Sequence, residues 1–163
     1  MKPPFTWEHF SEDENLKVRE IWGENSCARD PIVSTPYDVV MPRFYEAISD
    51  KIYNFDVRPD DIWIVTYPKC GTTWTQEIVW NMMNDVNKEL GTLPLFVRSP
   101  FLEVEGIHEK GNNFNQKRKL PPDPKVAEQM RRSHDDSVDM AAGLASPRII
   151  KSHMPLEFLP PNL

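Results

Sequence analysis

A lysine, a cysteine, a glycine and two threonines stand together between two apolar stretches of the chain. The run reads Tyr67-Pro68-Lys69-Cys70-Gly71-Thr72-Thr73. It follows the apolar segment 62–65, typical of a buried strand, and precedes a segment with helical periodicity. At such a turn, backbone N–H groups and hydroxyls converge on one point, where Lys69 adds a full positive charge and the helix start a partial one. The pattern predicts a binding site for a phosphate or sulfate group.

The order of the residues separates this turn from the usual nucleoside-triphosphate loop. That loop reads G-x-x-x-x-G-K-[ST], with the lysine directly after the second glycine. Here Lys69 precedes Gly71, and no Gly-Lys-Ser/Thr follows. An ordinary ATPase or kinase is therefore disfavoured. For the lysine considered alone, a plain turn with a solvated lysine and a threonine cap remains the alternative.

Two strands and two helices are the elements that must position this turn. The strands are predicted over 62–67 and 148–152, and a helix is predicted between Pro42 and Tyr53. A further helix starts at Thr73, because Thr73 and Gln76 have the spacing of a capping box. Its apolar stripe consists of Trp74, Ile78, Met82 and Val86.

The remaining segments give weaker patterns. A short helix is possible at 14–22, although the segment could equally be a loosely packed arm, and another helix is possible at 124–132. Apolar strands and intervening helices predict an α/β fold, a P-loop-like parallel sheet flanked by helices. We expect a single domain over 1–163. Because the sequence ends soon after the second predicted strand, we expect these residues to be the N-terminal portion of a domain with a larger sheet. Its parts are a polar arm (1–35), a loop-bearing core (36–106), a variable loop region (107–146) and a final strand with a proline-rich end (147–163).

The composition limits which binding partners and which cellular compartment we expect. The net charge of −6 disfavours a nucleic-acid surface, which is usually basic. Two cysteines, Cys27 and Cys70, are too few for a disulfide framework, and no Cys/His spacing matches a metal site. Neither a signal peptide nor a membrane span is apparent in the sequence. We expect a reducing, cytoplasmic setting without nucleic acid, membrane or metal.

Three segments together resemble one enzyme family, the cytosolic sulfotransferases. The run 66–74 differs from the family signature T-Y-P-K-S-G-T-T-W only at Cys70. The segment 151–160 resembles the family's K-T-H-x-P-x-x-x-L-P, and the segment 98–103 resembles R-x-P-F/W-L-E. The resemblance covers roughly 36–106 and 146–161.

The resemblance implies a reaction and a catalytic set. The family transfers a sulfuryl group from 3′-phosphoadenosine 5′-phosphosulfate (PAPS) to a hydroxyl or amine of a small acceptor, such as a phenol, an alcohol or an amine. His153 matches the family's catalytic base, and imidazole has a suitable pKa for that role. Lys69 matches the lysine on the leaving phosphate, and Lys151 a lysine near the transferring group.

The resemblance also implies binding residues. Lys69 and the loop residues Cys70, Gly71, Thr72 and Thr73 would hold the 5′-phosphate. Trp74 matches the residue that stacks on adenine, although its position on the helix also allows a core role. Phe101 would be a wall of the acceptor pocket, beside Lys151 and His153, or a core residue. The family needs no metal, and a full-length form is a possible homodimer.

The chain departs from the family in three respects. Cys70 replaces a serine, so a phosphate contact there would depend on the backbone N–H. The segment 107–146 is longer than expected, which leaves the acceptor open. The family's 3′-phosphate contacts follow the catalytic histidine and have no counterpart before Leu163. The alternative is therefore a catalytically inactive truncated sulfotransferase that binds nucleotide weakly or serves as a partner chain.

Overall fold

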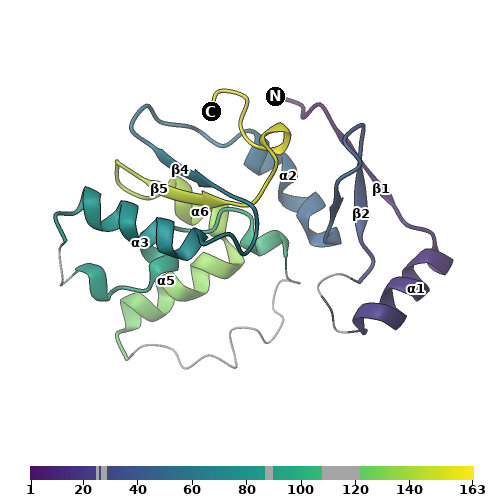
Figure 1. Ribbon diagram of the computed structural model, residues 1–163, viewed down its shortest axis with the longest axis horizontal. Helices are drawn as coiled ribbons and strands as arrows, with labels where there is room; N and C mark the ends of the chain where they lie inside the picture. Colours follow the sequence, from purple (N-terminus) through teal and green to yellow (C-terminus); the bar gives the residue numbers. More distant parts are fainter. Residues whose placement is uncertain (25, 27–28, 87–89, 108–121) are drawn as a thin grey trace.

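A two-stranded parallel sheet with helices on both faces lies at the centre of the molecule (Figure 1). The computed structural model describes residues 1–24, 26, 29–86, 90–107 and 122–163. Strand β4 (Ile62–Val65) pairs with β5 (Ile149–Ser152) in a register that sets Ile62 opposite Ile149 and Val65 opposite Ser152. Both predicted strands are confirmed, and so is the α/β class.

Alternate side chains of the two strands enter different cores. Ile64 and Ile149 pack with Trp80 of helix α3 (Thr72–Met83) on one face. Ile150 on the other face joins the main core, which includes Ile52 of helix α2 (Glu46–Tyr53). Strands that are apolar on both faces need cover on both, and α3 and α2 supply it. The helix predicted over 42–53 is confirmed as α2, preceded by the 3-10 helix η1 (Arg43–Tyr45).

A third extended segment joins the sheet through a single bridge. Phe101 forms an isolated parallel β-bridge with Lys151 of β5. The Lys151 N–H donates to the Pro100 carbonyl at 2.9 Å, and the Leu102 N–H donates to the Lys151 carbonyl at 2.9 Å. The short helices α4 (Leu95–Arg98) and η3 (Val104–Gly106) stand on either side. This pairing places the segment 100–103 beside the end of β5.

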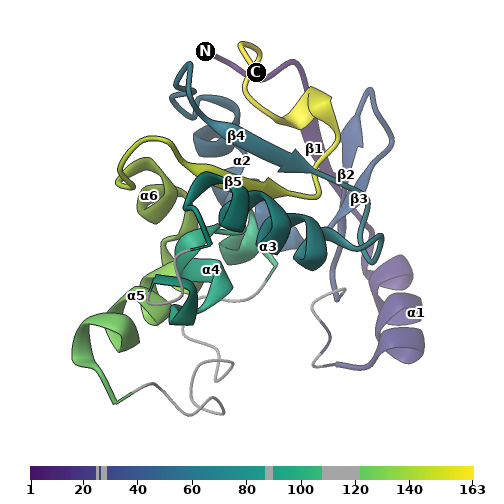
Figure 2. The same cartoon turned by 60° about the vertical axis from the view of Figure 1, so that its left-hand side comes forward.

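The N-terminal part of the chain forms a separate antiparallel sheet that the sequence did not predict. Strands β1 (Thr6–His9), β2 (Ile32–Thr35) and β3 (Val40–Met41) pair in that order. The first 35 residues, expected as a polar arm, thus place Phe5 and Ile32 in the main core. The predicted helix over 14–22 is confirmed as α1 (Glu12–Trp22), which has no buried residue and lies beside this sheet (Figure 2).

Helix α3 buries a different face from the one predicted. Its buried residues are Thr72, Gln76 and Trp80, whereas the stripe of Trp74, Ile78 and Met82 is exposed. The capping-box prediction is wrong, because Gly71 is the N-cap and makes no side-chain cap. The Gln76 amide instead donates to the Ser99 carbonyl at 3.0 Å and to Ser99 Oγ at 2.9 Å. A buried polar contact to the neighbouring segment therefore orients the helix.

The variable region contains two helices where it is described. Helix α5 (Pro124–Asp135) confirms the prediction at 124–132, and α6 (Ser137–Ala142) was not predicted. Most of the segment before α5, and Cys27, lie outside the described residues. Within those residues the free cysteine is Cys70, and no helix has the length and apolar character needed to cross a bilayer.

A buried ion pair fixes the amino end of the sheet. Arg148, directly before β5, donates to both carboxylate oxygens of Asp61, directly before β4, and its Nε–Oδ1 distance is 2.7 Å. The two side chains are 1% and 0% exposed. Burial acts to raise the pKa of Asp61, but hydrogen bonds from Arg148 and from the Arg58 N–H hold that pKa below its usual value. The pair ties the starts of β4 and β5 together.

Candidate functional site

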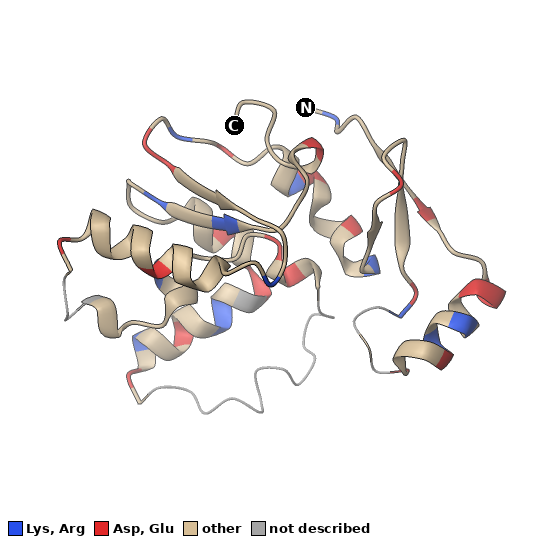
Figure 3. Ribbon diagram, viewed as in Figure 1, with Lys and Arg blue, Asp and Glu red and all other residues tan. Residues whose placement is uncertain are grey.

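The carboxyl ends of β4 and β5 meet the N-terminus of α3 around one cavity of about 300 Å³. Lys and Arg residues mark β5 and the loop before α3 in Figure 3. Most of the residues that the sequence singled out line this cavity: Lys69, Gly71, Thr72, Thr73, Trp74, Lys151 and His153. In open parallel sheets, ligands bind at this edge. Segments separated by about half the chain are thus brought together.

The loop between β4 and α3 is shaped by two left-handed residues. Gly71 has φ 96°, and Lys69 has φ 64°. A side chain at Gly71 would meet open space, so its conformation, rather than crowding, requires glycine there. The N–H groups of Gly71, Thr72 and Thr73 have no acceptor within the described part of the chain. Free donors at a helix start, beside Lys69, are suited to an anion.

His153 is held in one tautomer. Its Nδ1 lies 2.8 Å from the carbonyl oxygen of Thr66 and 3.3 Å from Thr66 Oγ1. A carbonyl oxygen only accepts hydrogen bonds, so Nδ1 carries the proton and donates it. Nε2 then retains its lone pair. Thr66 Oγ1 is also 2.6 Å from Thr72 Oγ1, which links the histidine to the first turn of α3.

Two cationic groups of the site have pKa values that favour their neutral forms more than usual. Burial lowers the pKa of His153, and the charge of Lys151 lowers it further, against the Thr66 carbonyl, which acts to raise it. Burial also lowers the pKa of Lys151, against the attraction of Glu103. A His153 pKa below 6.5 leaves the imidazole neutral at pH 7, which is the form able to accept a proton.

Glu103 contacts the backbone of His153. Its carboxylate is 0% exposed, and Oε1 accepts the His153 backbone N–H at 2.5 Å. Oε2 is buried and has no hydrogen-bond partner in the described structure. Burial raises the pKa of Glu103 to about 7, even though hydrogen bonds from the His153 N–H and the Ser152 side chain and the charge of Lys151 act to lower it. A buried carboxyl group with a strongly perturbed pKa is common at functional sites.

Two further predicted residues lie at the border of the cavity. The Phe101 ring stands edge-on to the His153 ring, with centroids 5.1 Å apart, and Lys151 Nζ lies 3.8 Å from the Phe101 ring centroid. Cys70 is exposed, and its sulfur is 4.0 Å from Thr72 Oγ1. Trp74 is 77% exposed, which excludes the core role in this chain.

Thr66 and Glu103 have site contacts that the sequence analysis did not assign to them. Both lie inside segments quoted for the family resemblance, at 66–74 and 98–103. The sequence could have indicated a special role for Glu103, because a glutamate directly after Phe101-Leu102 interrupts an apolar run. Thr66 gave none, since its contact to His153 uses the main-chain carbonyl.

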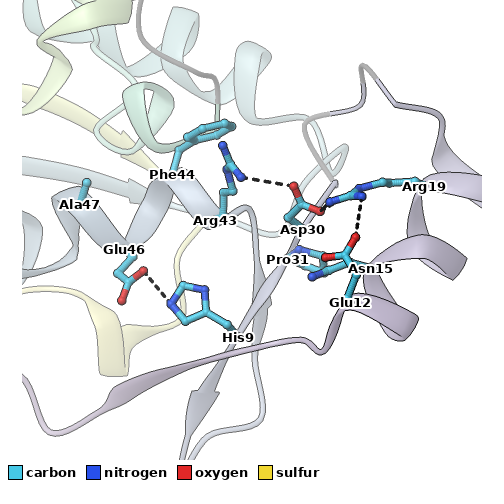
Figure 4. A pocket seen from close by; sticks show the side chains of 10 residues that line it. All are labelled: His9, Glu12, Asn15, Arg19, Asp30, Pro31, Arg43, Phe44, Glu46 and Ala47. Carbon is cyan, nitrogen blue, oxygen red and sulfur yellow. Dashed lines mark hydrogen bonds and ion pairs between the residues drawn. The ribbon is translucent and has the colours of Figure 1, made fainter.

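A larger cavity of about 730 Å³ lies away from these residues and is lined by α1, the end of β1, the segment before β2, η1 and the start of α2 (Figure 4). Its charged groups pair with each other: Asp30 with both Arg19 and Arg43, and His9 with Glu46. Because these charges are already matched, the cavity lacks the free cationic donors of the smaller site. Among the described residues no cluster of His, Cys, Asp and Glu could hold a metal ion.

Comparison with known proteins gives one consistent family. The family model for the sulfotransferase domain matches residues 59–163. Human Sulfotransferase 4A1 is 34% identical over 128 residues, which are 78% of this chain and 35% of that protein. Bovine Sulfotransferase 1E1 is 34% identical over 121 residues, 71% of this chain and 32% of that protein.

A solved structure gives the same result. The structure of retinol dehydratase, crystallised with retinol and PAP, superimposes on the present chain with a TM-score of 0.73 and 25% sequence identity. The match covers 99% of this chain and 49% of that protein. The present chain therefore spans about a third of the length of the curated relatives it matches, and about half of this structural relative.

Proposed function

This chain belongs to the sulfotransferase family, and on that premise we propose that its cavity binds the phosphosulfate end of PAPS and serves sulfuryl transfer to a small acceptor. PAPS would supply a sulfuryl group attached to a phosphate that can leave. One observation carries the proposal: Lys69, Lys151 and the neutral His153 line the same small cavity.

The chemistry of the lining fits an anionic donor. The N–H groups of Gly71, Thr72 and Thr73 lack acceptors among the described residues, and Lys69 is exposed beside them. Together they would hold the 5′-phosphate, with the Cys70 N–H as a further donor. The Thr72 hydroxyl already contacts Thr66, so only part of its bonding capacity is available to a ligand. Thr73 is exposed, so its hydroxyl is accessible to a ligand.

Each charged residue has a distinct role in the proposal. His153 Nε2 would accept the proton of the acceptor hydroxyl or amine, since Nδ1 is occupied by the Thr66 carbonyl. Lys69 would stabilise charge that develops on the leaving phosphate, and Lys151 would stabilise charge on the transferring group. Because the base is neutral imidazole, activity should fall as the pH drops through the His153 pKa, below 6.5.

The remaining roles concern the two organic partners. Trp74, exposed at the cavity, would stack on adenine. Phe101, against His153, would form a wall of the pocket for a phenol, an alcohol or an amine. We further propose a cytoplasmic location, and homodimerisation for a full-length form.

The test is transfer of radioactive sulfate from labelled PAPS to a panel of phenols, alcohols and amines. We expect His153→Ala to lower the rate by about 10²–10⁴-fold, the usual contribution of a general base. Lys69→Ala should lower it by about 10²–10³-fold, as for other groups that stabilise developing charge. Lys125→Ala is the matched control, because this lysine is exposed on α5.

Unchanged rates in both site variants would contradict the proposed roles. Nucleotide binding without transfer by the wild-type chain would instead favour the inactive alternative. Calorimetric titration with adenosine 3′,5′-bisphosphate separates these results, because it measures binding in the absence of any acceptor.

A further inference from the structure

The hydrogen-bond ladder between β5 and the segment 100–102 stops one step before it reaches His153. Two ladder bonds are made, from the Lys151 N–H to the Pro100 carbonyl and from the Leu102 N–H to the Lys151 carbonyl. In a regular parallel pair the next bond would run from the His153 N–H to the Leu102 carbonyl. That bond is not formed.

Two side chains replace the missing step. The Leu102 carbonyl accepts the Ser137 hydroxyl at 2.7 Å, and the His153 N–H donates to Glu103 Oε1 at 2.5 Å. Glu103 and Ser137 are both 0% exposed, so neither contact is shared with solvent. The carboxylate thus takes the place of a main-chain carbonyl, and the chain leaves the sheet at His153 without a buried, unpaired donor.

This exchange sets the direction of the imidazole. If the ladder continued, the next residues would extend along the sheet. Instead, the chain turns at His153, whose Nδ1 reaches the Thr66 carbonyl of β4's following loop at 2.8 Å. The backbone bond to Glu103 and the ring bond to Thr66 hold the residue from opposite ends. Its ring is also bounded by Phe101.

We propose that Glu103 is a positioning residue for His153: its carboxylate substitutes for a main-chain acceptor at the end of β5 and so keeps the imidazole in the Nδ1–H tautomer with Nε2 toward the cavity. The catalytic consequence of this positioning rests on the proposed function, in which His153 is the base. The contacts of His153 with Glu103 and Thr66 themselves involve no nucleotide. Glu103 touches no reacting group and acts only through His153.

The primary test is the tautomer of His153, read from ¹⁵N histidine spectra of the full chain without ligand. Four histidines are present, and His153→Asn identifies the signal. Wild type should show the Nδ1–H form. Glu103→Gln keeps an acceptor oxygen and should retain this form, whereas Glu103→Ala removes the acceptor and should give a mixture of both tautomers.

Glu105→Gln is the matched control. Glu105 is also buried, two residues away in η3, and its Oε1 accepts the Val138 N–H at 3.2 Å, on another element. This variant should leave the His153 spectrum unchanged. If Glu103→Ala does not fold, Glu103→Asp serves instead, because it keeps the charge but is one methylene shorter, and it too should give the mixture.

Two results would overturn the proposal. One is a pure Nδ1–H form in a folded Glu103→Ala or Glu103→Asp variant. The other is a mixture in Glu103→Gln, which would show that the acceptor oxygen is insufficient.

In transfer assays, Glu103→Ala should lower kcat at least tenfold and leave KM for PAPS within twofold. Absence of transfer by wild type would count against the proposed function alone, since the tautomer is measured independently.

Discussion

Two buried carboxylates mark the two ends of the parallel sheet and behave in opposite ways. At the amino end, Asp61 binds Arg148 through both oxygens, and these hydrogen bonds hold its pKa below its usual value despite burial. At the carboxyl end, Glu103 has one oxygen on the His153 N–H and the other without a partner, and burial raises its pKa to about 7.

The difference lies in the partner as well as in the depth of burial, because Glu103 is buried as a whole residue and Asp61 only in part. Both carboxylate side chains are 0% exposed, but only Asp61 has an arginine with matching geometry. The nearby cation at the carboxyl end, Lys151, acts on Glu103 at longer range and also lines the cavity. An anchor with matched charges therefore fixes one end of the sheet, while the other end keeps an incompletely satisfied carboxyl group beside the site.

Breaking the anchor should have the largest effect on stability. Asp61→Asn leaves Arg148 buried without a countercharge, and loss of one partner of a buried pair costs about 3–5 kcal/mol. Urea denaturation monitored by tryptophan fluorescence measures the change. Asp60→Asn is the control, because Asp60 is exposed and should change the free energy of unfolding by less than about 0.5 kcal/mol. Equal losses in the two variants would refute the anchor.

The two carboxylates should also give pH effects of opposite sign. A raised pKa means that the Glu103 contribution is fully present below its unfolded pKa of 4.5 and is lost as the pH rises through about 7. The Asp61 contribution is present above its unfolded pKa of 3.8 and is lost as the pH falls below that value.

Comparison of wild type with Glu103→Gln isolates the first of these effects. Between pH 4.5 and 7 the stability of wild type should fall relative to the variant by on the order of 3 kcal/mol. Burial and the Lys151 charge lower the His153 pKa in both proteins, whereas the Lys151 pKa, which the Glu103 charge acts to raise, also changes in the variant. A pH-independent difference would show that Glu103 has an ordinary pKa.

A smaller effect is expected at Ser137, which supports the unpaired end of the ladder. Its hydroxyl donates to the Leu102 carbonyl at 2.7 Å, and Ser137→Ala leaves that buried acceptor unsatisfied. The cost should be about 1–3 kcal/mol by denaturation. A shift of the His153 N–H onto the Leu102 carbonyl, visible by NMR, would mean that the ladder can close and that Glu103 is dispensable as its acceptor.

The sequence predicted the parts of the molecule in which local pattern and tertiary packing agree. Strands β4 and β5 are apolar runs buried on both faces, so composition alone identifies them. The turn at Lys69 to Thr73 could be placed because it lies between a strand and a helix. Lys151 lies on β5 and His153 follows directly after its end, and both line the cavity.

The features that were missed depend on contacts between distant segments. The stripe on α3 has helical periodicity, yet Gln76 faces inward because it binds Ser99, and Trp74 remains exposed. The antiparallel sheet pairs β1 with β2 across the intervening helix α1, which no local pattern encodes. Thr66 contacts His153 through its main-chain carbonyl, so its residue type gives no indication of the contact. Glu103 contacts the His153 backbone N–H through its carboxylate, and this pairing joins segments 50 residues apart.

The most direct test of the account is titration of the ¹⁵N-labelled chain with adenosine 3′,5′-bisphosphate, followed by NMR. Binding at the cavity predicts chemical-shift changes concentrated at Gly71, Thr72, Thr73 and the Trp74 indole, with a smaller change at His153, all of them lost in Lys69→Ala. Absence of shifts at these residues at millimolar nucleotide, or identical shifts in Lys69→Ala, would contradict the central claim that this loop holds the donor's phosphate.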